Sequence, residues 1–348
     1  MQTFSLKPNL YFGPDALATF KVLSGRRVLI VTDSFLASSG LLERLRVHLE
    51  DSDVTVFDQV TPDPSVELVA RGVQLLREVQ PDAVIAFGGG SPMDCAKAIR
   101  WSGGGRMPLW AVPTTAGTGS EMTAYAVLTD TDKGLKYPLV DDTLLPEYAV
   151  LDPSLLEGVP PSVTADTGMD VLTHAAEAYV SPKATPFTDA LAEKAFVLAY
   201  ESLPGAYRGD PERRGVMLYA SCMAGMAFNG AGLGICHSLA HALGGRLHLP
   251  HGRLNALLLP HVIRFNAADG EAAGRYAKLA KLCGLAASPR ALAGAVTRMP
   301  AALKMPTALT VDDPAAAAVA AMADPCTATN PRTPTQTELE TLLRGLGR

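Results

Sequence analysis

The sequence lacks several features that mark particular classes of protein. Its 348 residues contain no block of basic residues and carry a formal net charge of −5, which argues against nucleic acid as a partner. No apolar run reaches the roughly 18 residues of a membrane span, so no membrane partner is expected. The N-terminal segment has no basic stretch followed by an apolar core, so no secretory signal is predicted.

Cysteine and histidine are both scarce. The five cysteines form no CxxC pair, which favours reduced thiols and a cytoplasmic location. Of the seven histidines, four lie in GLGICHSLAHALGGRLHLPHG, residues 232–252. The chain is otherwise of ordinary globular composition, with 48% hydrophobic and 19% charged residues.

The first part of the chain alternates strand and helix patterns. Strands are predicted for residues 26–33, 53–60, 82–90 and 107–115, and helices for residues 41–50 and 65–80. Buried apolar strands joined by helices are typical of a mostly parallel sheet covered on both faces. We therefore expect an α/β domain with a Rossmann-like dinucleotide site over residues 1–160.

The pattern changes at a proline-rich crossing, residues 151–170, after which strand signals nearly vanish. The later segments are long and rich in alanine and leucine, which favours helices. We expect an all-helical domain over residues 161–348, with metal binding as its role.

Two glycine- and threonine-rich loops follow predicted strands. FGGGSPMDCAK, residues 87–97, lets backbone amides approach a phosphate at a helix N-terminus, although it is not a GxGxxG fingerprint. A plain strand-to-helix turn is an equally good interpretation of this loop alone. PTTAGTGSE, residues 113–121, offers hydroxyls and amides, although Thr118 or Ser120 before Glu121 also resembles a helix cap. Together the loops favour a pyrophosphate held between them.

Asp33 ends the first strong strand. A carboxylate there can accept hydrogen bonds from a ribose diol and repel a 2′-phosphate, which favours NAD over NADP. An N-cap for the next helix is an equally good interpretation of the bare sequence.

Helical spacing brings together two pairs of candidate metal ligands, although a satisfied histidine and an ordinary acidic residue on one helix explain the first pair better when it is taken alone. Asp170 and His174 lie four residues apart on a helix expected from about Thr167, with Glu177 at the edge of the same face. His237 and His241 repeat that spacing, while His248 and His251 follow it around Pro250. Asp and His ligands suit Fe²⁺ or Zn²⁺, but spacing alone does not select the ligands.

The motifs taken together resemble the iron-containing (group III) alcohol dehydrogenases. The matching pieces are FGGGSPMDCAKAI, PTTAGTGSE, LTDTDKGLKYPLVD, TADTGMDVLTHAAEAYVSP, AGMAFNGAGLGICHSLAHALGG and LPHGRLNALLLPHVIRFN, and they cover essentially the whole chain. TFSLKPNLYFG and VTPDP look most like the propanol dehydrogenases of bacterial propanediol utilisation.

The resemblance implies a role for each matching position. It makes Asp170, His174, His237 and His251 the metal ligands, His241 the proton-relaying histidine, Phe228 an aromatic of the substrate pocket and His248 a bystander. The implied cofactor positions are Gly89, Gly90, Ser91, Thr114, Thr115 and Thr118 for the pyrophosphate and nicotinamide side, Lys136 for the ribose, Tyr125 and Val127 beside the nicotinamide, and Asp33 for the selection of NAD.

The resemblance implies a metal-dependent, NAD(H)-dependent dehydrogenase of short primary alcohols, with propanal and 1-propanol as the leading pair. Fe²⁺ is the expected metal and Zn²⁺ the alternative. It further implies a homodimer or higher homo-oligomer and packaging in a bacterial microcompartment shell. The rivals are a zinc-dependent polyol oxidoreductase of the glycerol dehydrogenase type, a dehydroquinate-synthase-like relative, and a non-catalytic cofactor-binding component of such a compartment.

Overall fold

A computed structural model of the chain describes residue 4 and residues 7–131, 135–247 and 249–347, with residues 135 and 136 described by their backbone alone. The chain divides into two compact units, Met1–Gly158 and Val159–Arg348. The first is α/β and the described residues of the second form helices without a strand. The predicted fold class, an α/β domain followed by an all-helical one, is confirmed.

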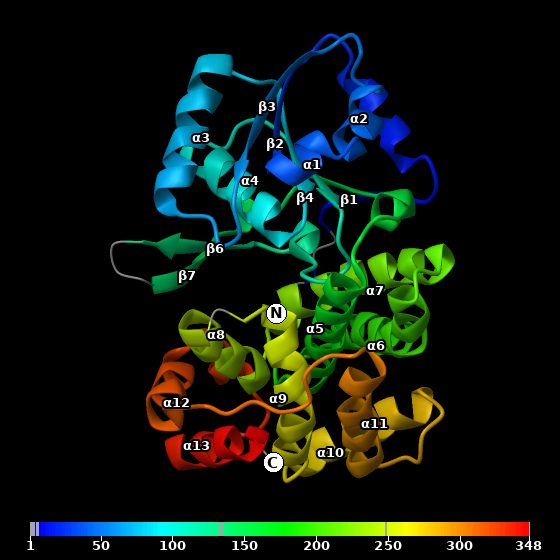
Figure 1. The fold of residues 1–348 in the computed structure, drawn as a ribbon, viewed down its shortest axis with the longest axis vertical. Coiled ribbons are helices and arrows are strands. Elements are labelled where there is room, and N and C mark those ends of the chain that lie inside the picture. The colour runs from blue at the N-terminus through cyan, green and yellow to red at the C-terminus, as the bar shows by residue number, and fades with distance from the viewer. Residues whose placement is uncertain (1–3, 5–6, 132–134, 248, 348) are drawn as a thin grey trace. The chain divides into compact units, whose positions relative to one another are not determined.

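The first unit is built on a parallel sheet. Within the described residues, six strands take the order β1-β8-β5-β4-β2-β3 (Figure 1). They are β1 (Asn9–Phe12), β2 (Arg27–Asp33), β3 (Asp53–Val60), β4 (Ala83–Gly88), β5 (Leu109–Pro113) and β8 (Tyr148–Leu151). Every residue of β4 is buried, as its uninterrupted apolar sequence requires in a strand covered on both faces. β6 (Tyr125–Asp130) and β7 (Leu135–Val140) form a separate antiparallel pair.

Helices pack on this sheet through their apolar stripes. They are α1 (Ser34–Ser38), α2 (Leu41–Arg46), α3 (Val66–Val79) and α4 (Gly90–Ser102), with 3₁₀ turns η1 (Ala16–Leu23), η2 (Ser120–Met122), η3 (Asp142–Leu144) and η4 (Pro153–Leu156). One core cluster joins Leu68 and Val73 of α3 and Ile99 of α4 to the strands. The helix predicted for residues 41–50 ends early, because the backbone changes to shorter i→i−3 hydrogen bonds that bury Leu49.

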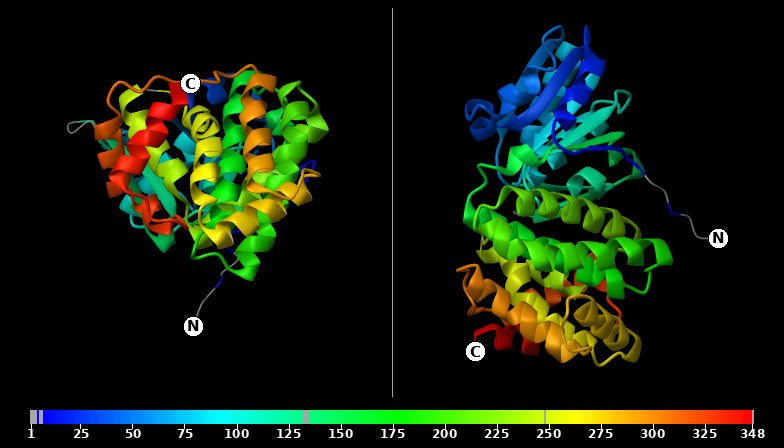
Figure 2. Two further views of the ribbon diagram at one scale, coloured as in Figure 1. Left: turned by 90° about the horizontal axis from the view of Figure 1, so that it is seen from below. Right: turned by 90° about the vertical axis from the view of Figure 1, so that its right-hand side faces the viewer.

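The second unit is a helical bundle around α5, as two views of the ribbon show (Figures 1 and 2). Its helices are α5 (Pro161–Val180), α6 (Pro186–Tyr207), α7 (Pro211–Ala231), α8 (Ile235–Leu247), α9 (His251–Asn266), α10 (Gly270–Leu282), α11 (Pro289–Ala302), α12 (Pro314–Ala323) and α13 (Gln336–Arg344), with 3₁₀ turns η5 (Pro325–Thr329) and η6 (Gly345–Gly347). α5 packs against α6, α7 and α9 and is buried along most of its length. It begins six residues before the predicted Thr167, because Pro161 at its first position has its φ pre-set for a helix.

No single helix among the described residues is long and apolar enough to cross a membrane. α7 and α8 pass that test only as a pair, bent by 103° at the break between them. Both helices carry many buried residues, which suits core helices of the bundle.

Candidate metal centre and cofactor loops

The helix α5 carries Asp170 and His174 on one face. They lie one turn apart, and His174 Nε2 is 3.9 Å from Asp170 Oδ1. Both side chains are buried, as the central place of α5 in the bundle dictates. An aspartate at such depth requires compensating partners, and imidazoles supply them.

Two other helices bring further imidazoles to the same carboxylate. His237 lies in the first turn of α8 and His251 is the first residue of α9. The Nε2 atom of each lies 3.7 Å from Asp170 Oδ1. Asp170, His174 and His237 thus form a buried group with the geometry to hold a metal ion, and His251 adds a fourth donor at the same oxygen.

The spacing of these atoms fits a first-row divalent cation. Ligand bonds of about 2.1 Å to a tetrahedral ion separate neighbouring donors by roughly 3.4 Å, close to the observed separations. The amide Nδ2 of Asn255 lies 2.7 Å from Asp170 Oδ1, 3.3 Å from His237 Nε2 and 3.1 Å from His251 Nε2. The amide nitrogen of Asn255 therefore lies among the same three donor atoms. A borderline-soft set of imidazoles and one carboxylate suits Fe²⁺ or Zn²⁺.

Electrostatics follow from this packing. Burial by itself would raise the pKa of Asp170, but His174 and His251 outweigh it and hold the pKa well below its usual range. Burial would lower the pKa of His237, yet hydrogen bonds to Asp170 and Glu177 and their negative charges raise it to about 9.

In the first unit, the glycine loop and the threonine loop lie side by side. A Cβ atom added to Gly89 would come within 3.1 Å of Thr115 Oγ1, and one added to Gly90 within 2.8 Å of Thr118 Cγ2. Thr114 N also donates to the carbonyl of Gly88, which has a positive φ. The loops therefore lie in close contact where β4 and β5 end, and a side chain at Gly89 or Gly90 would force Thr115 or Thr118 to shift.

The side chains of these loops differ in access to solvent. Ser91, Thr115 and Thr118 are partly exposed, whereas Thr114 is buried. Gly89 is the N-cap of α4, so the free amides of that helix start at the loop. Backbone amides and open hydroxyls together form an anion-binding edge.

A buried lysine anchors the threonine loop from behind, a contact that the sequence analysis missed. Lys97 Nζ donates to Ser120 Oγ at 2.8 Å and to the carbonyl of Tyr125 at 2.8 Å. Asp94 accepts from the same Ser120 hydroxyl and from the amide of Val127. Burial lowers the pKa of Lys97 to about 8, against the attraction of Asp94 and other acidic neighbours. Aspartate and lysine at i and i+3 of α4 were the available signal.

The remaining cofactor positions lie at the end of β2 and on the hairpin of β6 and β7. Asp33 Oδ1 accepts from the amide of Leu36 at 2.8 Å, so the capping interpretation of this carboxylate is correct. Val127 lies in β6 with an exposed side chain. Lys136 lies in β7 opposite Thr129, but its side chain is outside the described part of the structure. His248 is outside the described residues altogether.

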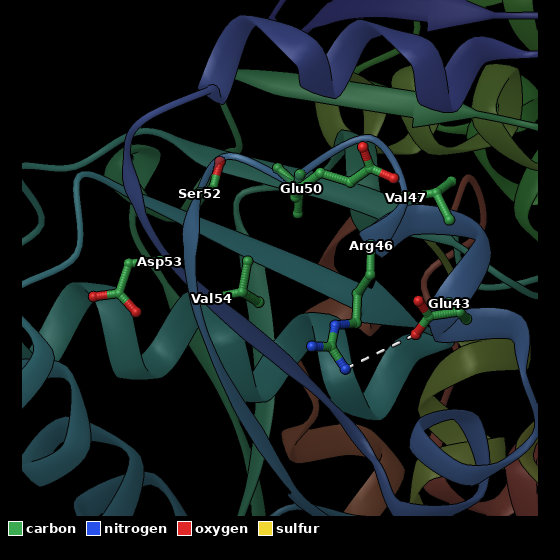
Figure 3. A pocket seen from close by; sticks show the side chains of 8 residues that line it. Glu43, Arg46, Val47, Glu50, Ser52, Asp53 and Val54 are labelled. Carbon is green, nitrogen blue, oxygen red and sulfur yellow. Dashed lines mark ion pairs between the residues drawn. The ribbon is translucent and has the colours of Figure 1, made fainter.

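A surface depression of about 390 Å³ lies elsewhere on the first unit (Figure 3). Its lining includes Arg46, which pairs with Glu43, and Ser52, Asp53 and Val54 at the start of β3. In a parallel sheet the starts of the strands lie at the edge opposite their carboxyl ends, where the glycine and threonine loops are. Ligands of open α/β sheets bind at the carboxyl ends, so this depression is not the cofactor site.

Comparison with known proteins decides the family. Residues 8–153 match the family described as iron-containing alcohol dehydrogenase, and residues 164–346 match the Fe-containing alcohol dehydrogenase family, C-terminal. The chain belongs to the iron-containing alcohol dehydrogenase family. The predicted family and the enzyme class, an oxidoreductase, are therefore confirmed.

Individual relatives agree with this assignment. The 1-propanol dehydrogenase PduQ of Salmonella typhimurium is 54% identical over 291 residues, which are 82% of this chain and 79% of the relative. A solved 1,3-propanediol oxidoreductase is 34% identical with a TM-score of 0.94 over 99% of this chain and 100% of that one. The sulfoacetaldehyde reductase of Bifidobacterium kashiwanohense, solved in complex with NAD⁺, is 29% identical with a TM-score of 0.90 over 99% and 98%.

In this iron-containing alcohol dehydrogenase, His241 lies one turn beyond His237 and points to a different partner. Its Nδ1 lies 2.9 Å from Asp324 Oδ2, and its ring stacks on His251 with centroids 5.1 Å apart. His241 is 43% exposed, so it has the access to solvent that a proton carrier needs. Burial would raise the pKa of Asp324, but the hydrogen bond and charge of His241 lower it to about 2.

Asp324 is a site residue that the sequence analysis missed. It stands 83 residues beyond His241, at the start of η5, where it also caps the turn by accepting from Cys326 N. His241, Asp324 and Cys326 form a second group of potential metal donors, more exposed than the first. Its only signal was the sequence DPCT at the end of an alanine-rich helix, which reads as a simple turn.

Phe228 lies beside the metal-binding group. It sits near the end of α7 and stacks on His174, with ring centroids 4.5 Å apart. The ring is 7% exposed, so it forms an apolar wall against the imidazole rather than a surface feature. An apolar wall beside a polarised oxygen excludes water from it.

Proposed function

We propose that this chain is an NAD(H)-dependent dehydrogenase that interconverts a short primary alcohol and its aldehyde, with 1-propanol and propanal as the leading pair. The observation that carries the proposal is the convergence of three imidazole nitrogens on Asp170 Oδ1 in a member of this family. The substrate class rests on the similarity to 1-propanol dehydrogenase over most of the chain. A complete donor set argues against a cofactor-binding component without activity.

In this proposal Asp170, His174, His237 and His251 hold Fe²⁺, with Zn²⁺ as the alternative. When bound, the ion supplies Lewis acidity to the substrate oxygen and NAD supplies or accepts the hydride. Phe228 limits the space beside His174 and keeps water from the reacting oxygen. Asp170 is the one charged group among the four donors. Its single negative charge does not neutralise a bound divalent ion, so the ion keeps a net positive charge.

His241 is the proposed proton carrier. Asp324 accepts a hydrogen bond from Nδ1–H of His241, which leaves Nε2 to take a proton from an alcohol or deliver one to an alkoxide. The exposed side of the ring then exchanges the proton with solvent.

The first unit is the proposed NAD-binding domain and the second the metal-binding domain. Gly89, Gly90 and Ser91 present amides at the start of α4 to the pyrophosphate, and Thr115 and Thr118 add hydroxyls from the adjoining loop. Thr114 supports the loop from within, since its side chain is buried and its amide donates to the carbonyl of Gly88. The assigned positions on the hairpin and at the ribose are Tyr125, Val127, Lys136 and Asp33.

We further propose a homodimer or higher homo-oligomer in the cytoplasm, packaged within a bacterial microcompartment. The support is the similarity to the relative named PduQ, and the shell packaging follows from the resemblance to propanediol-utilisation enzymes. Fluorescent fusions expressed with and without a microcompartment shell test the packaging, and light scattering of the purified protein tests the assembly.

The decisive experiment combines metal analysis with a cofactor assay. Protein purified without oxygen is analysed for iron and zinc, and NADH oxidation is followed across aldehydes of two to five carbons. We expect one iron per chain and the best kcat/KM with propanal. His251→Ala should lose most of the metal and the activity, while His248→Ala should keep both. Metal loss in the second variant with retention in the first would refute the assignment.

A further inference from the structure

A third carboxylate, Glu177, lies beside the metal-binding group without lying among its donors. It follows His174 by three residues on α5, and its side chain is 1% exposed. A carboxylate buried this deeply is costly unless hydrogen bonds satisfy both of its oxygens. The partners of these hydrogen bonds therefore identify the role of Glu177.

Both oxygens of Glu177 are used by the first turn of α8. Oε2 lies 2.6 Å from His237 Nδ1, and Oε1 accepts from the amide of Cys236 at 2.7 Å. That amide is one of the orphan donors at a helix N-terminus. One side chain of α5 thus caps α8 and contacts the ring of His237 at the same time.

The chain leading into α8 is built for this contact. A Cβ atom on Gly234 would lie 2.7 Å from Glu177 Oε1 and 2.8 Å from Asn330 Oδ1. Since side chains do not tolerate such distances to polar atoms, glycine is needed there for the helix start to approach. Asn330 Oδ1 accepts from the next amide, that of Ile235. The helix start is therefore held by two buried acceptors, one of which is Glu177.

We propose that Glu177 is a positioning residue of the metal centre, acting through His237. A carboxylate only accepts hydrogen bonds, so the contact at 2.6 Å requires a proton on His237 Nδ1. The lone pair of the neutral ring then lies on Nε2, the atom that faces Asp170 Oδ1 at 3.7 Å. Carboxylates in this arrangement fix the tautomer and orientation of a ligand histidine and make it more basic.

This inference rests on the proposed metal centre, and its test measures binding rather than turnover. Metal-free protein is titrated with Co²⁺, whose visible absorption reports coordination, in competition with a chelator. Glu177→Gln keeps the volume and an oxygen for the amide of Cys236, but its NH₂ group donates to His237 Nδ1 and moves the ring proton to Nε2. We expect Co²⁺ affinity to fall by a factor of about 10 to 100.

The matched control is Glu193→Gln. Glu193 lies on α6 and accepts from the hydroxyl of Tyr179, so it is another hydrogen-bonded glutamate of the same unit. Its substitution should leave Co²⁺ affinity and the spectrum unchanged. Equal affinity in Glu177→Gln and in the native chain would overturn the inference.

A double-substitution cycle separates positioning from a general effect on the fold. In His237→Ala the ring is absent, so adding Glu177→Gln should change Co²⁺ affinity less than two-fold, which is about 0.4 kcal/mol. A further ten-fold loss in the double variant would show that Glu177 acts through the bundle and not through His237. If the native chain itself binds no Co²⁺, the proposed metal centre fails instead, which distinguishes the two failures.

If Glu177→Gln does not fold, Glu177→Asp answers the same question. It keeps an acceptor while shortening the side chain by one methylene, so the ring proton stays on His237 Nδ1. We expect an intermediate Co²⁺ affinity with the native absorption maximum. Native affinity in this variant, despite a withdrawn carboxylate, would also overturn the inference.

Discussion

Gly252→Ala should disrupt the metal centre without touching a metal ligand. Gly252 is the second residue of α9, directly after His251, and it faces the backbone of α5. An added Cβ atom would lie 2.6 Å from the carbonyl carbon of Asp166, closer still to its oxygen, and 3.3 Å from Asp170 Cβ. Backbone cannot rotate out of the way as a flexible side chain can. One helix therefore has to move.

The size of that movement follows from the contact distances. Ordinary contact begins at 3.4 Å, so the start of α9 has to withdraw from α5 by about 0.8 Å or more. Metal–ligand distances tolerate only about 0.2 Å, so His251 can no longer share an ion with Asp170. Overpacking of this kind also costs about 1–3 kcal/mol of folding stability.

The assay is a Co²⁺ titration together with urea unfolding of the metal-free protein. Gly252→Ala should lower Co²⁺ affinity by about ten-fold or more and lower the unfolding midpoint. Gly274→Ala is the control, because Gly274 lies inside α10 with nothing within 4 Å of its added Cβ. That change should leave metal binding intact and stabilise the helix by about 0.5–1 kcal/mol. Native metal affinity in Gly252→Ala would refute the account of helix packing.

Four other substitutions test other parts of the chain. Burial raises the pKa of Glu121 to about 7 from an ordinary 4.5, so the folded state binds the proton of this carboxyl more tightly than the unfolded state does. The stability that this proton contributes below pH 4.5 is lost as the pH rises through 7, a loss of about 3 kcal/mol. Glu121→Gln should abolish that loss when urea unfolding at pH 5 is compared with urea unfolding at pH 8. Asp33→Ser keeps an oxygen for the amide of Leu36, so the free energy of unfolding should fall by less than about 1 kcal/mol. Removal of the carboxylate should raise kcat/KM with NADPH relative to kcat/KM with NADH. An unchanged ratio of these two values would leave Asp33 as a helix cap alone. His241→Ala should lower kcat by about 100-fold while the content of bound metal stays unchanged. Asp324→Asn should lower kcat by a smaller factor. Loss of metal in either variant would contradict the role of His241 as the proton carrier.

Local patterns of the sequence were sufficient for β2, β3, β4 and β5 of the first unit, whereas β1, β8 and the β6–β7 pair were not predicted. Apolar runs such as residues 82–90 predict buried parallel strands, because a strand covered on both faces has no polar side. Once the strands are parallel, their carboxyl ends share one edge, so two loops after neighbouring strands are expected to meet. The contact between Gly90 and Thr118 is the outcome of that geometry.

Capping was also readable from the sequence, but only as one of two alternatives. Asp33 accepts from Leu36 N, as an N-cap does, and the same carboxylate stands at the end of β2 where a ribose would lie. A single hydrogen bond inside the chain does not exclude the second role. The kcat/KM values of Asp33→Ser with NADPH and NADH separate the role of helix cap from the role of ribose contact.

Tertiary structure decided the histidines and their carboxylates. Helical spacing makes His237 and His241 equivalent, since four residues return a side chain to the same face. Their separation arises because α5 approaches the start of α8, with Glu177 and Asp170 against His237, while η5 brings Asp324 to His241. These contacts join residues 60 to 83 positions apart. Periodicity reports only which side of a helix a residue is on, so the sequence determined where the histidines lie and the packing of the helices decided what each one touches.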